Sequence, residues 1–132
     1  MQTLGIRHIA LNVADPQASK KFYVDTFGMT VEWEPDPENV YLTSGGQDNL
    51  AIHKAQPSDP NTQQRLDHIG FALATIDSVD TWFERVTKLG VKIVHDPKTH
   101  RDGARSFYCA DPNGVVIQMI YHPPIAERAK RV

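Results

Sequence analysis

Two short stretches, "IRHIAL" at residues 6–11 and "LDHIGF" at residues 66–71, decide how this chain folds. Each sets one histidine, His8 or His68, in a run of alternating side chains that is typical of a β-strand. In such a strand, small residues share a face with the histidine, and larger apolar residues occupy the other face. We therefore expect two related strands, each with a histidine on one face and an apolar face for a helix to cover.

The residues after each stretch repeat one order of elements, β-α-β-β-β, over about residues 4–55 and again over about residues 66–122. In each half a helix ends at a glycine, Gly28 or Gly90, which tolerates the left-handed conformation that closes a helix. Three more strands follow in each half. The repeat predicts an α+β fold in which two βαβββ modules form a single domain over residues 1–132.

The helix starts and faces can also be predicted. Asp15 is the expected N-cap of the first helix, with Pro16 at the first helical position, and Asp77 is the expected N-cap of the second. Apolar residues at helical spacing predict the buried faces. They are Ala18, Phe22, Tyr23 and Phe27 in the first helix, and Val79, Trp82, Phe83, Val86 and Leu89 in the second.

Three polar segments lie outside these elements. Residues 56–65, "QPSDPNTQQR", predict a linker between the modules, and residues 123–132 predict a C-terminal tail that is either a short helix or a frayed end. Residues 96–102 could form a mobile lid, although an exposed polar loop is the simpler interpretation. Residues 45–49, "GGQDN", are too short for a phosphate-binding loop.

The composition fits a small protein with a small ligand. Apolar residues make up 40% of the chain, which is enough for a core, and a net charge of -2 argues against nucleic acid or an anionic membrane as a partner. The sequence contains neither an apolar run of about 18 residues nor a secretory signal layout. Its one cysteine, Cys109, excludes an internal disulfide and a cysteine-cluster metal site, and is expected to pack in the core. We expect a soluble, cytoplasmic protein.

The repeat relates four polar residues in pairs. Superimposing the opening strands pairs His8 with His68, and superimposing the closing strands pairs His53 with Gln118. Alanine and glycine share the strand face of each histidine, which leaves room for a cavity, although Gln118 shares its face with larger residues. Each histidine taken alone is better explained by a local hydrogen bond, whereas repeat-equivalent positions favour one shared site.

Three further residues are candidates for the substrate pocket. Asn12 lies on the His8 face and could orient a substrate, or could simply be a pocket amide. Arg105 could bind a substrate carboxylate or phosphate through two hydrogen bonds, although a solvated strand arginine is the commoner case. Tyr108 lies on the strand before Gln118.

The stretches "IRHIALNVADPQASKKFYVDTFGM", "LDHIGFAL" and "RSFYCADPNGVVIQMIY" resemble the vicinal oxygen chelate superfamily, the glyoxalase, bleomycin resistance protein and extradiol dioxygenase family. The resemblance implies paired βαβββ modules that form a cupped mixed sheet with helices on the outer face, around a divalent metal. It places the metal ligands at His8, His53, His68 and Gln118. It also implies a homodimer.

The sequence departs from that family at its carboxylates. The family usually has glutamate at the position of Gln118, and often at that of His53. Neutral imidazoles suit Zn²⁺, Ni²⁺, Fe²⁺ or Co²⁺, an amide oxygen is a weak extra ligand, and Mn²⁺ is also among the candidate ions. The resemblance implies a metal-dependent lyase, isomerase or dioxygenase that chelates a small substrate through two oxygens. With no glutamate to act as base, His53 or metal-bound hydroxide could serve, and the catalytic base stays unassigned. The alternative is a metal-free binding protein of the bleomycin-resistance type.

Overall fold

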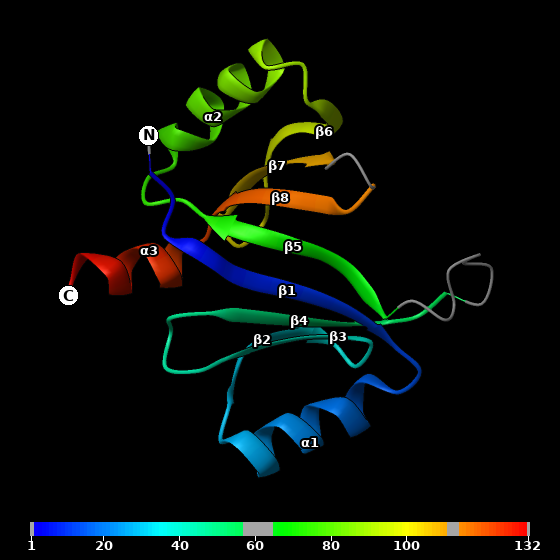
Figure 1. The fold of residues 1–132 in the computed structure, drawn as a ribbon. Helices are drawn as coiled ribbons and strands as arrows, with labels where there is room; N and C mark the ends of the chain where they lie inside the picture. The colour runs from blue at the N-terminus through cyan, green and yellow to red at the C-terminus, as the bar shows by residue number, and fades with distance from the viewer. Residues whose placement is uncertain (1, 57–64, 111–113, 132) are drawn as a thin grey trace. The chain divides into compact units, whose positions relative to one another are not determined.

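The computed structural model describes residues 2–56, 65–110 and 114–131, and within them it contains three helices and eight strands (Figure 1). The order is β-α-β-β-β, the same order again, and a final helix. The elements are β1 (Gly5–Val13), α1 (Pro16–Phe27), β2 (Thr30–Asp36), β3 (Asn39–Thr43), β4 (Asn49–Lys54), β5 (Leu66–Ala72), α2 (Asp77–Lys88), β6 (Lys92–Thr99), β7 (Arg105–Ala110), β8 (Val116–Tyr121) and α3 (Pro123–Lys130). The chain divides into a first unit, residues 8–67, and a second unit, residues 68–132 together with residues 1–7.

The first unit carries four strands in the order β2-β3-β4-β1. β1 runs parallel to β4, and the other neighbours are antiparallel, so the pairing is mixed. Helix α1 contributes Tyr23 and Val24 to the apolar cluster on one face of these strands. The buried members of that cluster are Met29, Val40, Leu42 and Ile52.

The second unit has the matching order β5-β8-β7-β6, again with one parallel pair, β5 with β8. Its apolar cluster is larger, and Trp82, Phe83 and Val86 of α2 pack against it. The buried members are Leu73, Val79, Phe107, Cys109 and Met119. The predicted α+β class with mixed strand pairing is therefore confirmed.

The local signals for helix ends were correct at three of four positions. Asp15 caps α1, its carboxylate accepting from the backbone N–H groups of the second and third helical residues, and Gly28 and Gly90 adopt φ of 70° and 78°. Asp77 was wrong as a cap, because it is the first residue inside α2. The N-cap position is Ile76, which makes no side-chain cap hydrogen bond, and one residue earlier Thr75 Oγ1 accepts from the Ser78 N–H at 3.2 Å.

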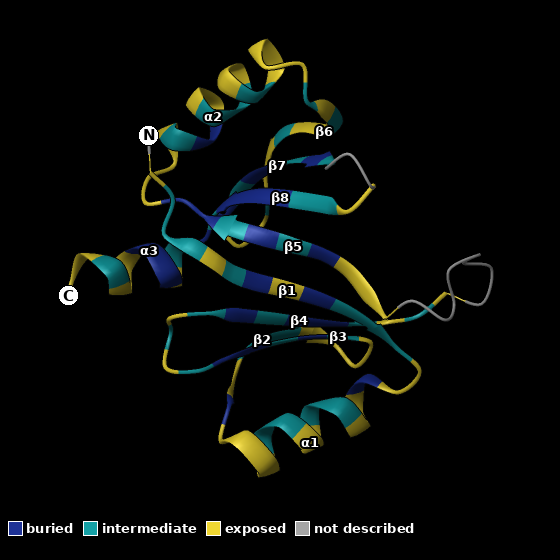
Figure 2. Ribbon diagram, in the orientation of Figure 1, coloured by how far each residue is buried: buried dark blue, intermediate teal, exposed yellow. Residues whose placement is uncertain are grey.

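The apolar faces of the helices were only partly predicted (Figure 2). Leu89 is 66% exposed, because α2 ends at Lys88 and leaves it beyond the last turn. Phe22 and Phe27 are 53% and 66% exposed, and their rings contact each other edge to face at 5.8 Å between centroids. Those three positions were wrong as core residues.

Two loop predictions have different outcomes. Residues 96–102 were expected to form an exposed loop, but β6 continues to Thr99, which pairs with Arg105 of β7. Residues 57–64 of the predicted linker and residues 111–113 of the last turn lie outside the described residues. The predicted tail forms helix α3. Of the three described helices, none has the length and apolar character needed to cross a membrane.

Candidate functional site

The parallel pairing of β1 with β4 fixes which polar residues meet in the first unit. His8 lies opposite Asn49, Ala10 lies opposite Ala51, and Asn12 lies opposite His53. His53 is therefore four residues further along the strands than the position opposite His8, which is about 13 Å at about 3.3 Å per residue. The two histidines lie at opposite ends of the pairing, with a row of alanines between them.

His8 is buried and belongs to a short chain of polar side chains. Its Nδ1 lies 2.7 Å from Oδ1 of Asn49, which is also buried. The Asn49 amide nitrogen donates to Oε2 of Glu32, on β2, at 2.6 Å. Glu32 is half-buried, so the chain runs from an inner imidazole to a carboxylate nearer the surface.

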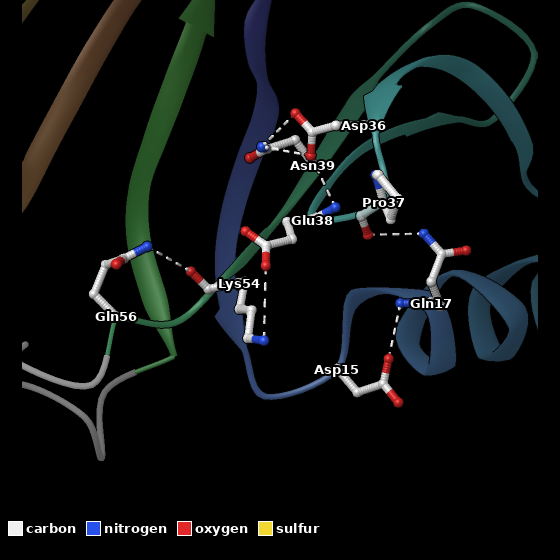
Figure 3. A network of polar contacts seen from close by, with 8 residues as sticks. All are labelled: Asp15, Gln17, Asp36, Pro37, Glu38, Asn39, Lys54 and Gln56. Atoms are coloured by element: carbon white, nitrogen blue, oxygen red, sulfur yellow. Dashed lines mark hydrogen bonds and ion pairs between the residues drawn. The ribbon is translucent and has the colours of Figure 1, made fainter.

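His53 belongs to a second chain of the same type. Its Nδ1 lies 2.6 Å from Oδ1 of Asn39, which is opposite it on β3. The Asn39 amide nitrogen donates to both carboxylate oxygens of Asp36, at 3.0 and 3.1 Å (Figure 3). The ring of Tyr41 lies edge to face with the His53 ring, 5.7 Å between centroids.

The turn that carries Asp36 is held by contacts from two other elements (Figure 3). Gln17 of α1 donates its amide N–H to the Pro37 carbonyl at 2.8 Å. The Glu38 N–H donates to Asp36 Oδ1 at 2.8 Å, and the Lys54 ammonium lies 3.7 Å from the Glu38 carboxylate. The position of the Asp36 carboxylate, at the end of the hydrogen-bond chain from His53, is thus fixed by the backbone of its own turn.

The second unit joins its histidine to a different chain. His68 Nε2 lies 3.0 Å from Oε1 of Gln118, whose amide nitrogen donates to Ser106 Oγ at 2.8 Å. Ser106 Oγ lies 3.0 Å from Nε2 of His100. The first three of these residues are 6%, 4% and 1% exposed. Burial lowers the pKa of His100, against a smaller raising effect of Asp102.

The predicted equivalence of His53 and Gln118 was wrong by two residues. In the second unit Gln118 lies opposite Gly70, two residues after His68. The matching position in the first unit is Ala51, opposite Ala10 and two residues after His8. A superposition of strand sequences cannot detect this shift, because the register of a parallel pair depends on packing and connections rather than on a local motif.

The structure places Tyr108 beside His68 and Gln118. Tyr108 is the register partner of Gln118 on β7, and its ring lies edge to face with those of His68 and His95, at 5.3 and 5.4 Å between centroids. Of the three predicted pocket residues, Tyr108 is the one that joins the His68 chain.

Arg105 and Asn12 are engaged elsewhere. Arg105 lies on the opposite face of β7 from Ser106 and Tyr108, since side chains alternate along a strand. Its guanidinium donates two hydrogen bonds to the carboxylate of Asp80 on α2, at 3.0 and 2.8 Å, and these lower the pKa of Asp80. Asn12 donates to the Asp67 carboxylate at 3.2 Å. Their roles toward a substrate stay predictions.

The His68 and Gln118 pair has a spacing that suits a metal ion. Two neighbouring ligands with bonds of about 2.1 Å at right angles are about 3 Å apart. The imidazole Nε2 and the amide oxygen are 3.0 Å apart in a hydrogen bond, in which Nε2 carries the hydrogen that a bound metal would replace. In the described part of the chain, no group of three or more His, Cys, Asp or Glu side chains is arranged to hold a metal. The pair fits two positions of a coordination sphere, one of which is an amide.

Several residues of these chains were not predicted. Asn49 could have been found, because alternation along β4 already places it on the His53 face. Ser106 likewise shares a face with Tyr108. Glu32 could not have been found, because the pairing of β2 with β3 contains register shifts that no sequence pattern marks.

A duplicated β-α-β-β-β order with polar chains on its strands defines a glyoxalase-like α+β protein. The family model described as "Glyoxalase/Bleomycin resistance protein/Dioxygenase superfamily" matches residues 5–119. The chain therefore belongs to this superfamily, as the resemblance of its strand motifs indicated.

Individual relatives are similar to this chain at low identity. The chain is 25% identical over 114 residues to the metallothiol transferase FosB of Lysinibacillus sphaericus, covering 86% of this chain and 79% of that protein. It superimposes with a TM-score of 0.73 and 22% identity on methylmalonyl-CoA epimerase of Streptomyces coelicolor, solved with 2-nitronate-propionyl-CoA, over 92% of this chain and 99% of that chain. The Mn(II)-bound glyoxalase of Novosphingobium aromaticivorans gives 0.72 and 23%, over 91% of this chain and 39% of that one.

Proposed function

We propose that this protein is a metal-dependent enzyme of the glyoxalase or dioxygenase type. Its small substrate would bind the metal through two oxygen atoms. The observation that carries the proposal is the buried contact between His68 Nε2 and Gln118 Oε1, at the spacing of two neighbouring metal ligands. Membership of the superfamily supports it, as do the metallothiol transferase and the Mn(II)-bound glyoxalase among the relatives.

The chain's own residues would prepare the site in distinct ways. A bound divalent metal would act as a Lewis acid toward substrate oxygens. Ser106 accepts from the Gln118 amide nitrogen, and in this orientation the amide oxygen faces His68. Tyr108 packs its ring edge to face with the His68 ring, which limits rotation of that ring.

The resemblance also names His8 and His53 as ligands, and their positions make them unequal candidates. His53 is about 13 Å along the strands from the residue opposite His8, and it is not the register equivalent of Gln118. On the resemblance we propose His8 as a further ligand, and the separation of His53 from His8 along the strands argues against both binding one ion.

Metal analysis of the purified protein tests the proposal. We expect one Zn²⁺, Ni²⁺, Mn²⁺, Fe²⁺ or Co²⁺ per chain after incubation with each ion, and loss of that metal in His68→Ala and in His8→Ala. His53→Ala, the matched control, should keep full occupancy. Retention of stoichiometric metal by His68→Ala would contradict the assignment. Circular dichroism of each variant separates a lost ligand from a lost fold.

A second candidate function is metal-free binding of a small molecule. It is favoured by the Gln118 amide, whose oxygen and nitrogen both form hydrogen bonds within the chain, to His68 and Ser106. Bleomycin titrated into chelator-treated protein provides a probe. Micromolar binding that does not change when metal is restored would support this candidate, whereas binding only after metal is restored would support the enzyme.

We also propose that the chain forms a homodimer, on the resemblance alone. Analytical ultracentrifugation should then give about twice the mass of one chain. A sedimentation coefficient that corresponds to one chain at all concentrations would exclude the dimer.

A further inference from the structure

The two polar chains of the first unit share a feature: each ends in a carboxylate. The described contacts of His68 through Gln118 lead instead to Ser106 and His100. An ionised carboxylate accepts hydrogen bonds and cannot donate them. The Asn49 atom that faces Glu32 at 2.6 Å must therefore be the amide nitrogen, which donates. The carboxylate thus orients the amide group of Asn49.

That orientation determines the hydrogen on the next residue. With its nitrogen toward Glu32, Asn49 turns its carbonyl oxygen toward Nδ1 of His8 at 2.7 Å. A carbonyl oxygen only accepts, so Nδ1 must carry the hydrogen. In the neutral ring the electron pair then lies on Nε2, because one imidazole nitrogen donates and the other accepts.

The second chain leads to the same result by the same steps. Asp36 accepts from the Asn39 amide nitrogen through both carboxylate oxygens, and Asn39 Oδ1 faces Nδ1 of His53 at 2.6 Å. The hydrogen therefore lies on Nδ1 of His53 as well. The turn contacts of Glu38 and Gln17 keep the Asp36 carboxylate in place (Figure 3).

We propose that Glu32 and Asn49 are positioning residues that hold His8 in the Nδ1–H tautomer, and that Asp36 and Asn39 do the same for His53. Each ring then presents Nε2 as an electron-pair donor, the state that a metal ligand or a general base requires. Free histidine favours the opposite tautomer, with the hydrogen on Nε2. Each carboxylate and asparagine pair therefore selects the less common tautomer. The consequence for metal binding rests on the proposed function, whereas the tautomer itself does not.

The His68 chain provides an internal contrast. It continues through Ser106 to His100, and a hydroxyl group both donates and accepts. Ser106 accepts from the Gln118 amide nitrogen here, but a hydroxyl could equally donate to an amide oxygen, so Ser106 does not force one orientation of the Gln118 amide as a carboxylate would. The contact of His68 also uses Nε2 rather than Nδ1. The contacts through Gln118 and Ser106 therefore do not set the tautomer of His68 in the way that Glu32 and Asp36 set those of His8 and His53.

Nuclear magnetic resonance of the ring nitrogens tests the proposal directly. Chelator-treated protein labelled with ¹⁵N-histidine is measured at about pH 8.5, above the ordinary histidine pKa of about 6.5. Long-range ¹H–¹⁵N correlations distinguish protonated from unprotonated ring nitrogens, and His8→Gln and His53→Gln assign the signals. We expect the hydrogen on Nδ1 in both rings. A hydrogen on Nε2 of His8 in the parent protein overturns the proposal.

Two variants serve as controls for each other. Glu32→Gln introduces an amide that can donate as well as accept, so we expect the Nε2–H form of His8 to rise while His53 stays unchanged. Asp36→Asn should do the reverse. If Glu32→Gln leaves the tautomer of His8 as it was, Glu32 is not a positioning residue. If Glu32→Gln does not fold, the spectrum of the parent protein still tests the tautomers of both histidines, and Asp36→Asn still tests the role of Asp36.

Zn²⁺ titration distinguishes this proposal from the proposed function. If His8 is a ligand, Glu32→Gln should weaken Zn²⁺ binding about 10-fold, as loss of an outer hydrogen-bond partner does in metal sites. Asp36→Asn should leave it unchanged. A parent protein that binds no Zn²⁺ but shows both Nδ1–H rings would overturn the proposed function alone. Unchanged Zn²⁺ affinity in a folded Glu32→Gln would overturn the role of Glu32 in metal binding.

Discussion

The two units place a histidine at the same point of the same element order and then surround it differently. In the first unit His8 contacts an asparagine that is backed by Glu32. In the second unit His68 contacts Gln118, which is backed by the neutral Ser106. A repeated strand motif therefore fixes where a histidine lies, while the neighbouring strands decide what its ring can do.

The apolar sides of the units differ in a related way. Helix α2 packs three large side chains against a cluster that contains the fully buried Phe107. Helix α1 leaves Phe22 and Phe27 largely exposed and packs mainly through Tyr23 and Val24. The same order of elements is thus stabilised by more helix burial in the second unit than in the first.

The largest expected effect tests this difference in packing. Phe107→Ala should lower the free energy of unfolding by about 3–5 kcal/mol, because it leaves a cavity beneath Phe83. The ring centroids of Phe83 and Phe107 are 5.4 Å apart. Phe27→Ala should change the free energy of unfolding by less than about 0.5 kcal/mol, because that side chain is exposed. Urea denaturation measures both. Similar losses in the two variants would contradict this difference in packing between the units.

A smaller effect separates the two kinds of polar chain. Gln118→Ala should cost about 2 kcal/mol of unfolding free energy, because it removes a hydrogen-bond partner from His68 and Ser106, which are both buried. Asn39→Ala should cost about 1 kcal/mol, since water can reach the exposed Asp36. Denaturation in the presence of a chelator keeps metal binding out of the measurement. A larger loss for Asn39→Ala would reverse the comparison.

The smallest effect concerns pH. Burial lowers the pKa of His100, so the folded state binds fewer protons there than the unfolded state. The stability from the neutral ring is complete above the unfolded pKa of about 6.5, and is lost as pH falls below it. The parent protein should therefore lose more stability between about pH 7 and pH 5 than His100→Gln does. Parallel profiles would show that His100 does not contribute.

The sequence predicted the features that depend on a few neighbouring residues. The cap at Asp15, the glycine ends and the faces of the histidines follow from local backbone chemistry and from strand alternation. The equivalence of His53 and Gln118 failed, because it required the register between strands that are distant in sequence. The hydrogen bonds from Glu32 through Asn49 to His8 could not be predicted for the same reason, because they cross strands whose pairing is irregular.

The burial of Cys109 has a practical consequence for labelling. It is the chain's one cysteine, it is 4% exposed, and burial raises the pKa of its thiol. Reagents that attack the thiolate therefore meet a hidden and protonated group in the folded protein. A cysteine introduced at the exposed Thr81 of α2 would react first, and would carry a fluorophore or spin label without removal of the native residue.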